Sequence, residues 1–234
     1  MIRPLMPAYL PIWLLLGVSA VAGCTSPRVV TLTLYDSPDA FVRLEVDRTV
    51  QQETGHSHPA DLSTEQMALV LRGITVEEPM TRLPLYDDFS QPRRHAALTE
   101  KEISLFSPLL ALAFTKAAPE ELVTFYTSRS LSGTNREVTS GGLFVKGDEL
   151  HVILANYRSP THYTADIGVA DTTDDRLVPM RAIAPQRGRL DFEPRSAKRE
   201  VADAALDKLL HHDKRELIVL YKSLQPLPAS SDNH

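Results

Sequence analysis

The sequence contains very little cysteine, with one residue, Cys24, in 234. A disulfide within one chain is therefore excluded, and so is a zinc or redox site built from several cysteines. The fold has to be held by its hydrophobic core, which the ordinary globular content of 43% hydrophobic and 24% charged residues can supply. Glycine is scarce beside proline, 10 residues against 17, so stiff loops are expected.

Several functional signatures are also missing. The formal net charge of −5 gives no support for a nucleic-acid partner, which requires a clustered basic surface. The chain has no nucleophile elbow, HExxH, Walker loop or dinucleotide fingerprint, and no cofactor is predicted. These absences favour a non-catalytic protein. They do not exclude an enzyme, because scattered Ser, His and Asp residues can converge in space.

One long apolar run is present, near the N-terminus. It extends from Ala8 to Val21, follows the basic residue Arg3, and is about 14 residues long, short of the ~20 that a spanning helix needs. No second run approaches that length. The run ends in Val21-Ala22-Gly23-Cys24.

These first 24 residues resemble the signal peptide of a bacterial lipoprotein, which ends in a lipobox of an aliphatic residue, a small residue, Gly or Ala, and Cys. The resemblance implies cleavage after Gly23, a diacylglycerol on the sulfur of Cys24, and an acylated amino group such as a palmitoyl amide. Thr25, where some enteric lipoproteins carry Asp, resembles the outer-membrane default. The implied location is the cell envelope, on the periplasmic face of the outer membrane. The alternative is a chance cysteine after a secretory signal or membrane span.

This interpretation divides the chain into four parts. Residues 1–23 are a cleaved signal peptide, 24–28 a lipidated cysteine with a short tether, 29–224 a single domain, and 225–234 a disordered tail. A strand begins within about six residues of Cys24, which holds the domain within roughly 20 Å of the membrane. The Leu98–Tyr126 helix-strand unit and the Ser140–Tyr157 hairpin also resemble uncharacterised envelope lipoproteins, without residue roles.

Alternating apolar and polar residues predict antiparallel strands. Residues 30–35 and 40–46 form one expected hairpin. A second spans residues 138–157 with a primed turn at Gly147-Asp148, which pairs Lys146 with Glu149 and Leu143 with Val152. The inward side of this hairpin is then wholly apolar.

Capping boxes predict the starts of two helices, at Ser63 with Gln66 and at Thr99 with Glu102. Pro108 in the second helix predicts a kink or a new start. A third helix is expected over residues 197–211. The predicted fold class is α+β, a mostly antiparallel sheet with about three helices packed on it.

Polar clusters that could carry chemistry are few. His56 and His58 could ligate a metal, but nothing nearby completes a tetrahedral set, so a solvated loop is preferred and no metal site is predicted. An acid cluster lacks the spacing of a calcium loop and is expected in a solvated turn; it contains Asp171, Asp174 and Asp175. A glycine pair after Ser140 favours a bulge or close backbone packing over a phosphate cradle.

A basic run suggests one further partner. Seven cations between Arg176 and Arg199 could meet anionic lipid headgroups or an acidic protein, although ordinary paired surface charge is the preferred interpretation. The His211-His212 pair is a poor chelate, because adjacent residues point apart.

The leading hypothesis is a lipid-anchored, non-catalytic interaction or envelope-assembly module with Cys24 as its one assigned site residue. One alternative is a membrane-tethered hydrolase-like enzyme whose cleft is lined by the 77–97 and 158–196 loops and unites a nucleophile with His151 or His162. Another is a carrier of a hydrophobic ligand, which would need an apolar cavity between helices and sheet.

Overall fold

The computed structural model describes residues 29–50, 55–77, 93–132, 135–162, 175–186, 188–199 and 216–224. The predicted signal peptide, Cys24 and the predicted C-terminal tail lie outside these ranges. No helix within them is long and apolar enough to cross a membrane.

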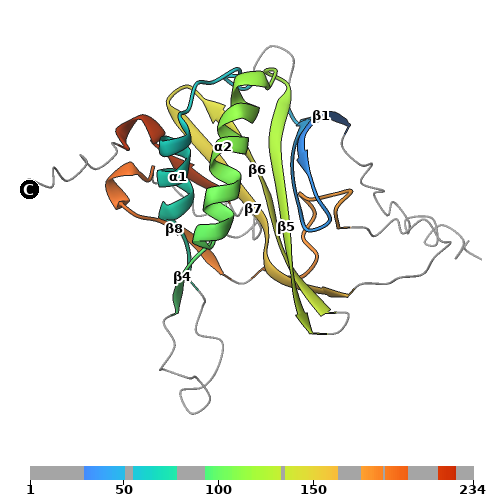
Figure 1. The fold of residues 1–234 in the computed structure, drawn as a ribbon. Coiled ribbons are helices and arrows are strands. Elements are labelled where there is room, and N and C mark those ends of the chain that lie inside the picture. The colour runs from blue at the N-terminus through green and yellow to red at the C-terminus, as the bar shows by residue number, and fades with distance from the viewer. Residues whose placement is uncertain are drawn as a thin grey trace, which may run out of the picture.

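The centre of the domain is a six-stranded antiparallel sheet with the order β1-β2-β5-β6-β7-β9 (Figure 1). Its strands are β1 Val30–Asp36, β2 Ala40–Val46, β5 Glu121–Ser132, β6 Asn135–Lys146, β7 Glu149–His162 and β9 Glu216–Val219. A smaller sheet has the order β4-β3-β8, from Arg94–Ala96, Ile74–Glu77 and Arg189–Phe192.

Both predicted hairpins are confirmed. Strands β1 and β2 pair antiparallel, and β6 pairs with β7 in the predicted register, with Lys146 opposite Glu149 and Leu143 opposite Val152. Gly147 has φ +62°, the left-handed conformation that this turn requires. The bulge expected at the glycine pair is also present, because the β6–β7 register shifts on both sides of Ser140.

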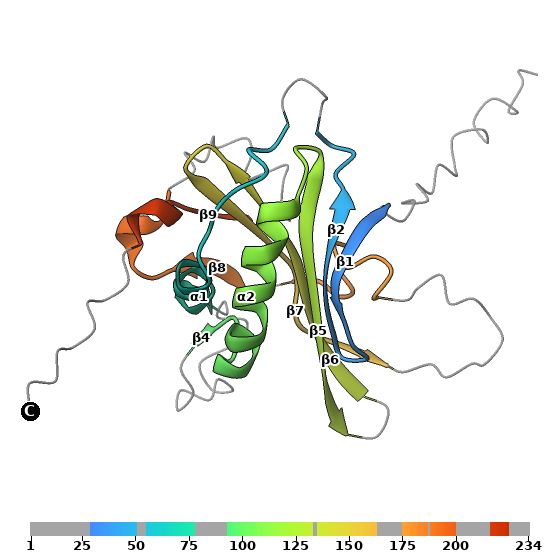
Figure 2. The same cartoon turned by 45° about the horizontal axis from the view of Figure 1, so that its top comes forward.

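Two helices, α1 Thr64–Gly73 and α2 Glu100–Lys116, cover one face of the six-stranded sheet, here called the inner face (Figure 2). Both begin with the predicted capping boxes, in which Ser63 and Thr99 accept from the backbone N–H three residues on. Small residues Ser107 and Ala111 face the same side of α2 as Glu100, which pairs with Arg72 at the end of α1.

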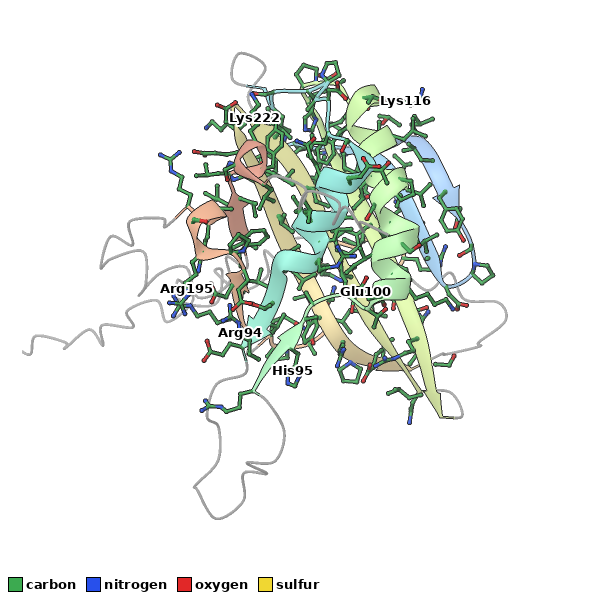
Figure 3. All side chains as sticks on the ribbon, turned by 60° about the vertical axis from the view of Figure 1, so that its left-hand side comes forward. Arg94, His95, Glu100, Lys116, Arg195 and Lys222 are labelled. Atoms are coloured by element: carbon green, nitrogen blue, oxygen red, sulfur yellow. The ribbon has the colours of Figure 1, made fainter. Side chains whose placement is uncertain are left out.

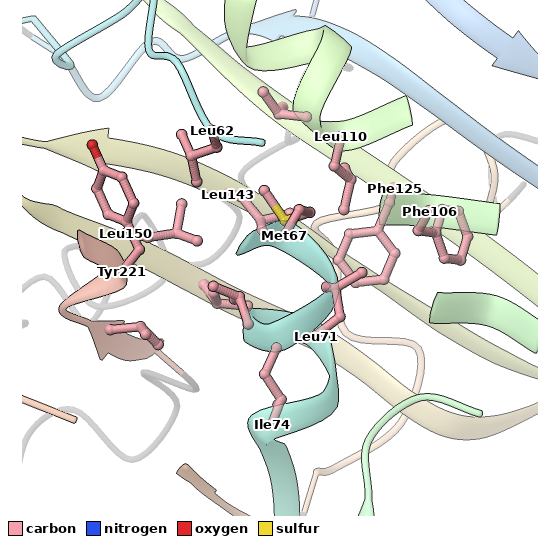
Figure 4. Packing of buried hydrophobic residues seen from close by; sticks show 14 of the residues in the cluster. Leu62, Met67, Leu71, Ile74, Phe106, Leu110, Phe125, Leu143, Leu150 and Tyr221 are labelled. Atoms are coloured by element: carbon pink, nitrogen blue, oxygen red, sulfur yellow. The ribbon is translucent and has the colours of Figure 1, made fainter. Parts of the chain in front are cut away.

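The helices and the inner face enclose one hydrophobic core (Figure 4). Phe106 of α2 meets Phe125 of β5 edge to face, with 5.5 Å between ring centroids. The inward side chains of the predicted β6–β7 hairpin are buried here, as the alternation indicated: Leu143, Val145, Leu150, Val152 and Leu154.

Of the two alternatives predicted at Pro108, the new helix start was wrong, because α2 runs without interruption from Glu100 to Lys116. Pro108 is exposed, and the hydroxyl of the preceding Ser107 donates to the Ile103 carbonyl at 2.6 Å. The helix is held on both sides of the proline by its buried face, so the packing outweighs the missing backbone hydrogen bond.

About three helices were predicted, and the described residues contain two α-helices. The third was expected to start at Ala197, which instead ends a 3-10 turn, Arg195–Ala197. Leu220 donates to the Ala197 carbonyl and Arg199 donates to Ile218, so these backbone groups pair with the β9 segment rather than with a helix. The rest of that predicted helix lies outside the described residues.

The prediction that residues 77–97 form a loop was also partly wrong. Arg94–Ala96 forms strand β4 on β3, with Val76 opposite His95, while residues 78–92 lie outside the described ranges. Three residues are too few to show an alternation, so the sequence carried no signal for this strand.

Candidate functional site

An irregular segment, residues 175–186, lies across the other face of the six-stranded sheet, here called the outer face; it is the paler orange segment in Figure 1. Side chains of the strands hold its backbone. Ser140 donates to the Pro179 carbonyl at 2.6 Å, and Asn156 donates to the Arg181 carbonyl and accepts from the Ile183 N–H, each at 2.8 Å. Two buried polar side chains therefore replace the ladder of a regular strand.

One end of this segment is fixed by a buried polar cluster. Arg136 of β6 donates to both carboxylate oxygens of Asp175, at 2.8 and 3.0 Å, and to the Tyr126 hydroxyl at 3.1 Å. Tyr126 in turn donates to Asp175. Burial, followed by the charge of Asp175, raises the pKa of Tyr126 to about 12, so the phenol keeps its proton.

The expectation of a solvated turn was wrong for Asp175, which is 6% exposed. Its partners, Tyr126 and Arg136, lie 49 and 39 residues away in the sequence, so no local pattern marks it. Asp171 and Asp174 lie outside the described residues.

Aromatic rings close the outer face beside this cluster. Phe41 and Tyr126 stack with 5.2 Å between centroids and 7° between planes. The guanidinium of Arg43 lies 3.9 Å from the Phe41 centroid, and that of Arg176 lies 5.4 Å from it. The cluster is closely packed, and its role is to fix the start of the 175–186 segment on the sheet.

An apolar groove opens next to the segment, with a volume of about 470 Å³. One wall is strand β7 and the other is the second half of the 175–186 segment. The lining residues are mostly small or aliphatic: Ile153, Leu154, Ala155, Met180, Ala182, Ile183, Ala184, Pro185 and Gln186. A hydrophobic-ligand cavity was expected between helices and sheet, whereas this groove lies on the outer face.

Met180 of the groove wall packs closely on Gly142 of β6. A Cβ at Gly142 would come within 2.9 Å of the Met180 sulfur and 2.7 Å of a Leu122 methyl group. The neighbouring Gly141 is more restricted, because its Cβ would lie 2.1 Å from the Ile153 carbonyl oxygen. The predicted close backbone packing is thus confirmed.

Three histidines gather at the other end of the sheet. Phe144 stacks between His56 and His151, with centroid distances of 4.2 and 4.4 Å. His151 Nδ1 lies 2.6 Å from a Glu216 oxygen, and His56 Nε2 lies 3.3 Å from Asp47. The prediction of a solvated loop was therefore wrong for His56 and His58, which pack on the sheet.

His58 is the most enclosed of them, with 6% of its surface exposed. Its Nε2 accepts from the Val145 N–H at 3.0 Å, and its Nδ1 faces the Ala118 carbonyl. An acceptor nitrogen cannot carry a proton, so this geometry requires the neutral ring. Burial, and secondly the nearby His56, lowers the pKa of His58 to about 4.

The described residues bring no catalytic constellation together. His151 contacts Phe144 and Glu216, and none of the hydroxyls in this part of the chain hydrogen-bonds to a histidine. Groups of three or more potential metal ligands are likewise missing from the ranges that the structure covers. The side chain of His162, residues 211–212 and Cys24 lie outside those ranges.

Three of the six described cations of the basic run form ion pairs. Arg176 pairs with Asp36 at 2.6 Å, Lys198 pairs with Asp191 at 2.7 Å, and Arg199 pairs with Glu149. This agrees with the preferred interpretation as paired surface charge. Sequence reasoning missed Asn156, the residue that holds the groove wall, because a single buried asparagine in a strand has no pattern of its own.

No protein-family model matches this chain, and neither a curated protein nor a solved structure gives a significant match.

Proposed function

We propose that the chain is a bacterial envelope lipoprotein, anchored by lipid on Cys24 to the periplasmic face of the outer membrane, and that its domain is a non-catalytic interaction or assembly module. The lipobox supports the anchor. The apolar groove beside β7 supports binding and carries the second half of the proposal. Its occupant is an apolar segment of an envelope protein.

The chemistry of the groove favours binding over catalysis. Eight of the nine lining residues are apolar, and the amide of the ninth, Gln186, already bonds Ser159 and the Ala184 carbonyl. Burial of apolar side chains is the main driving force of protein association. The nearby polar side chains that could take part in catalysis are Ser140 and Asn156. Both already form hydrogen bonds that hold the groove wall.

The anchor is tested by detergent partition and fatty-acid labelling of the full chain. The wild-type protein is expected to take up labelled fatty acid and enter the detergent phase. Cys24→Ser removes the thiol that forms the thioether and should do neither. Equal behaviour of the two proteins would contradict the anchor.

The groove is tested by a photo-crosslinking residue at Ala182, an exposed position of its rim, with Leu131 at the far end of β5 as the matched exposed control. Irradiation in cells should give a discrete protein adduct from position 182 and none from position 131. Adducts at both sites, or at neither, would contradict a specific protein partner.

A second function, carriage of a hydrophobic ligand, is favoured by the volume of the groove. About 470 Å³ lies within the 300–1,000 Å³ that small-molecule sites occupy. The same experiment separates the two functions. A lipid-sized adduct at position 182, detected by mass spectrometry without a protein adduct, supports the carrier.

A further inference from the structure

One end of the six-stranded sheet, here called the tether end, collects the start of β1, the end of β2, the end of α2 and the β6–β7 turn. Val46 donates to the Val29 carbonyl, Asp47 donates to Glu120, and His56 donates to Pro119. Ser57 links this edge to Val145 of β6 through a further backbone hydrogen bond. These segments therefore form one continuous surface.

The tether end is the point from which the N-terminal segment departs. Val29 is the first described residue and lies five positions after Cys24. Five residues span at most about 18 Å at full extension. A lipid on Cys24 would consequently keep this end, and not the opposite one, next to the bilayer.

Exposed apolar side chains occur at this end. Val29 and Val30 at the start of β1 are 53% and 42% exposed, and Leu112 in the last turns of α2 is 46% exposed. Leu112 continues the row of Leu105 and Leu109, which pack partly against the core on the side of α2 away from α1.

Three cations lie at the ends of the elements that meet here. Arg48 follows β2, Lys116 ends α2 one turn beyond Leu112, and Lys146 ends β6 (Figure 3, Lys116 labelled). All three are exposed, and none forms an ion pair within the described ranges. Asp148 of the turn is paired with Lys222. Other carboxylates at this end are the exposed Glu120 and Asp61 and the buried Asp47 and Glu121.

We propose that the tether end is a membrane-contact surface that binds anionic phospholipid headgroups through Arg48, Lys116 and Lys146 and places Val29, Val30 and Leu112 at the headgroup boundary. Apolar side chains edged by Lys and Arg are the pattern of interfacial binding. An anionic membrane surface attracts each cation independently. The contact fixes the orientation of the anchored domain and leaves the outer-face groove free for its partner.

This inference moves the anionic-lipid contact away from the 176–199 run, whose Arg176 and Lys198 are paired. It rests on the anchor of the proposed function. It does not rest on the groove.

The test uses the lipidated protein reconstituted into vesicles of phosphatidylglycerol and phosphatidylcholine that carry a lipid-bound quencher. Lipid blocks the thiol of Cys24, so Leu112→Cys provides a single site for a fluorophore. Lys101→Cys is the matched control, because it lies on the same face of α2 about 16 Å nearer the helix start. Quenching is expected at position 112 and not at position 101.

Removal of the charges should release the contact. The triple variant R48Q/K116Q/K146Q is expected to lose the quenching at position 112, since each neutralised cation weakens the contact about fivefold. The matched variant K101Q/R189Q/R195Q removes three exposed cations elsewhere and should keep it. Vesicles of phosphatidylcholine alone should behave like the first triple variant.

The outcomes are separable. Protein recovered with the vesicles but quenched equally at both positions, or unaffected by the first triple variant, overturns the contact and leaves the anchor intact. Failure to recover protein with the vesicles overturns the anchor and the contact together. Disulfide crosslinking between copies through Val30→Cys, with no quenching at position 112, would show that this surface joins two chains instead.

Discussion

The two faces of the six-stranded sheet are covered by different means. The inner face is packed by two regular, capped helices whose contacts are almost entirely apolar. The outer face is covered by the 175–186 segment, which has no regular structure and is held by Asp175, Ser140 and Asn156. The inner face derives its stability from buried area, and the outer face from a few directed polar contacts.

This difference separates stability from function. On the inner face, many apolar contacts pack the two helices against the sheet. On the outer face, three polar side chains fix one segment, and a groove lies along the second half of that segment. The groove that can bind a ligand therefore lies beside the 175–186 segment, which a few polar side chains hold on the sheet.

The largest effect is expected from Phe106→Ala on the inner face. Phe106 is fully buried, and its removal leaves a cavity against Phe125, which should lower the free energy of unfolding by about 3–5 kcal/mol. Urea titrations followed by circular dichroism measure this loss. The exposed Leu112→Ala on the same helix is the control and should change stability by less than about 0.5 kcal/mol.

Asp175→Ala should come next, at about 3 kcal/mol, because it leaves Arg136 largely buried without its counter-ion. The control Asp36→Ala breaks an ion pair in which the carboxylate is 62% exposed, so its loss should stay below about 1 kcal/mol. If the two variants were equally stable, directed polar contacts would not hold the outer face.

His58 joins the two faces, because it packs edge-on against Phe114 and neighbours His56, which stacks on Phe144. Its pKa in the folded protein, about 4, lies below the ordinary 6.5, so the unfolded chain binds the proton more tightly. Stability should therefore fall as the pH drops from about 6.5 to 4, by up to about 3 kcal/mol, and show no further loss from His58 below pH 4.

The pH dependence is measured by urea titration across that window. His58→Gln keeps an acceptor for the Val145 N–H but cannot titrate, so this variant should show a flatter profile. If the pH profile of His58→Gln matched that of the wild type, the assignment to His58 would be falsified.

The smallest effect is expected at the start of α2. Thr99→Ala removes the acceptor for the Glu102 N–H and should cost about 1 kcal/mol. Thr99→Ser retains the hydroxyl and should be unchanged. A loss as large as that of Asp175→Ala would mean that the inner face also depends on directed polar contacts.

The inner face was largely predictable from the sequence, because its determinants are local. Alternation placed the hairpin strands, the Gly147-Asp148 turn set their register, and Ser63 and Thr99 marked the helix starts. The lipobox at Cys24 is equally local. It stays a prediction, because it lies outside the described residues.

The outer face was not predictable, because its determinants are distant in the sequence. Asp175 finds Arg136 across 39 residues and Asn156 finds Ile183 across 27. The packing of His56 and His58 required knowing that the 55–58 loop crosses the sheet end. Strand β4 is too short to give a recognisable alternation in the sequence. The third helix was wrongly predicted to begin at Ala197, because the first residues of that segment pair with the β9 segment.

The pairing of β2 with β5 has a consequence for the order in which the protein is made. Val46 and Glu121 are opposite each other in the sheet, yet 75 residues separate them along the chain. Synthesis proceeds from the N-terminus, so the β1–β2 hairpin emerges first and waits, with Val42 and Leu44 uncovered, until β5 and α2 arrive. Closing that long loop is the slow step expected for such non-local pairing, and a chain that stops before residue 121 cannot build the six-stranded sheet.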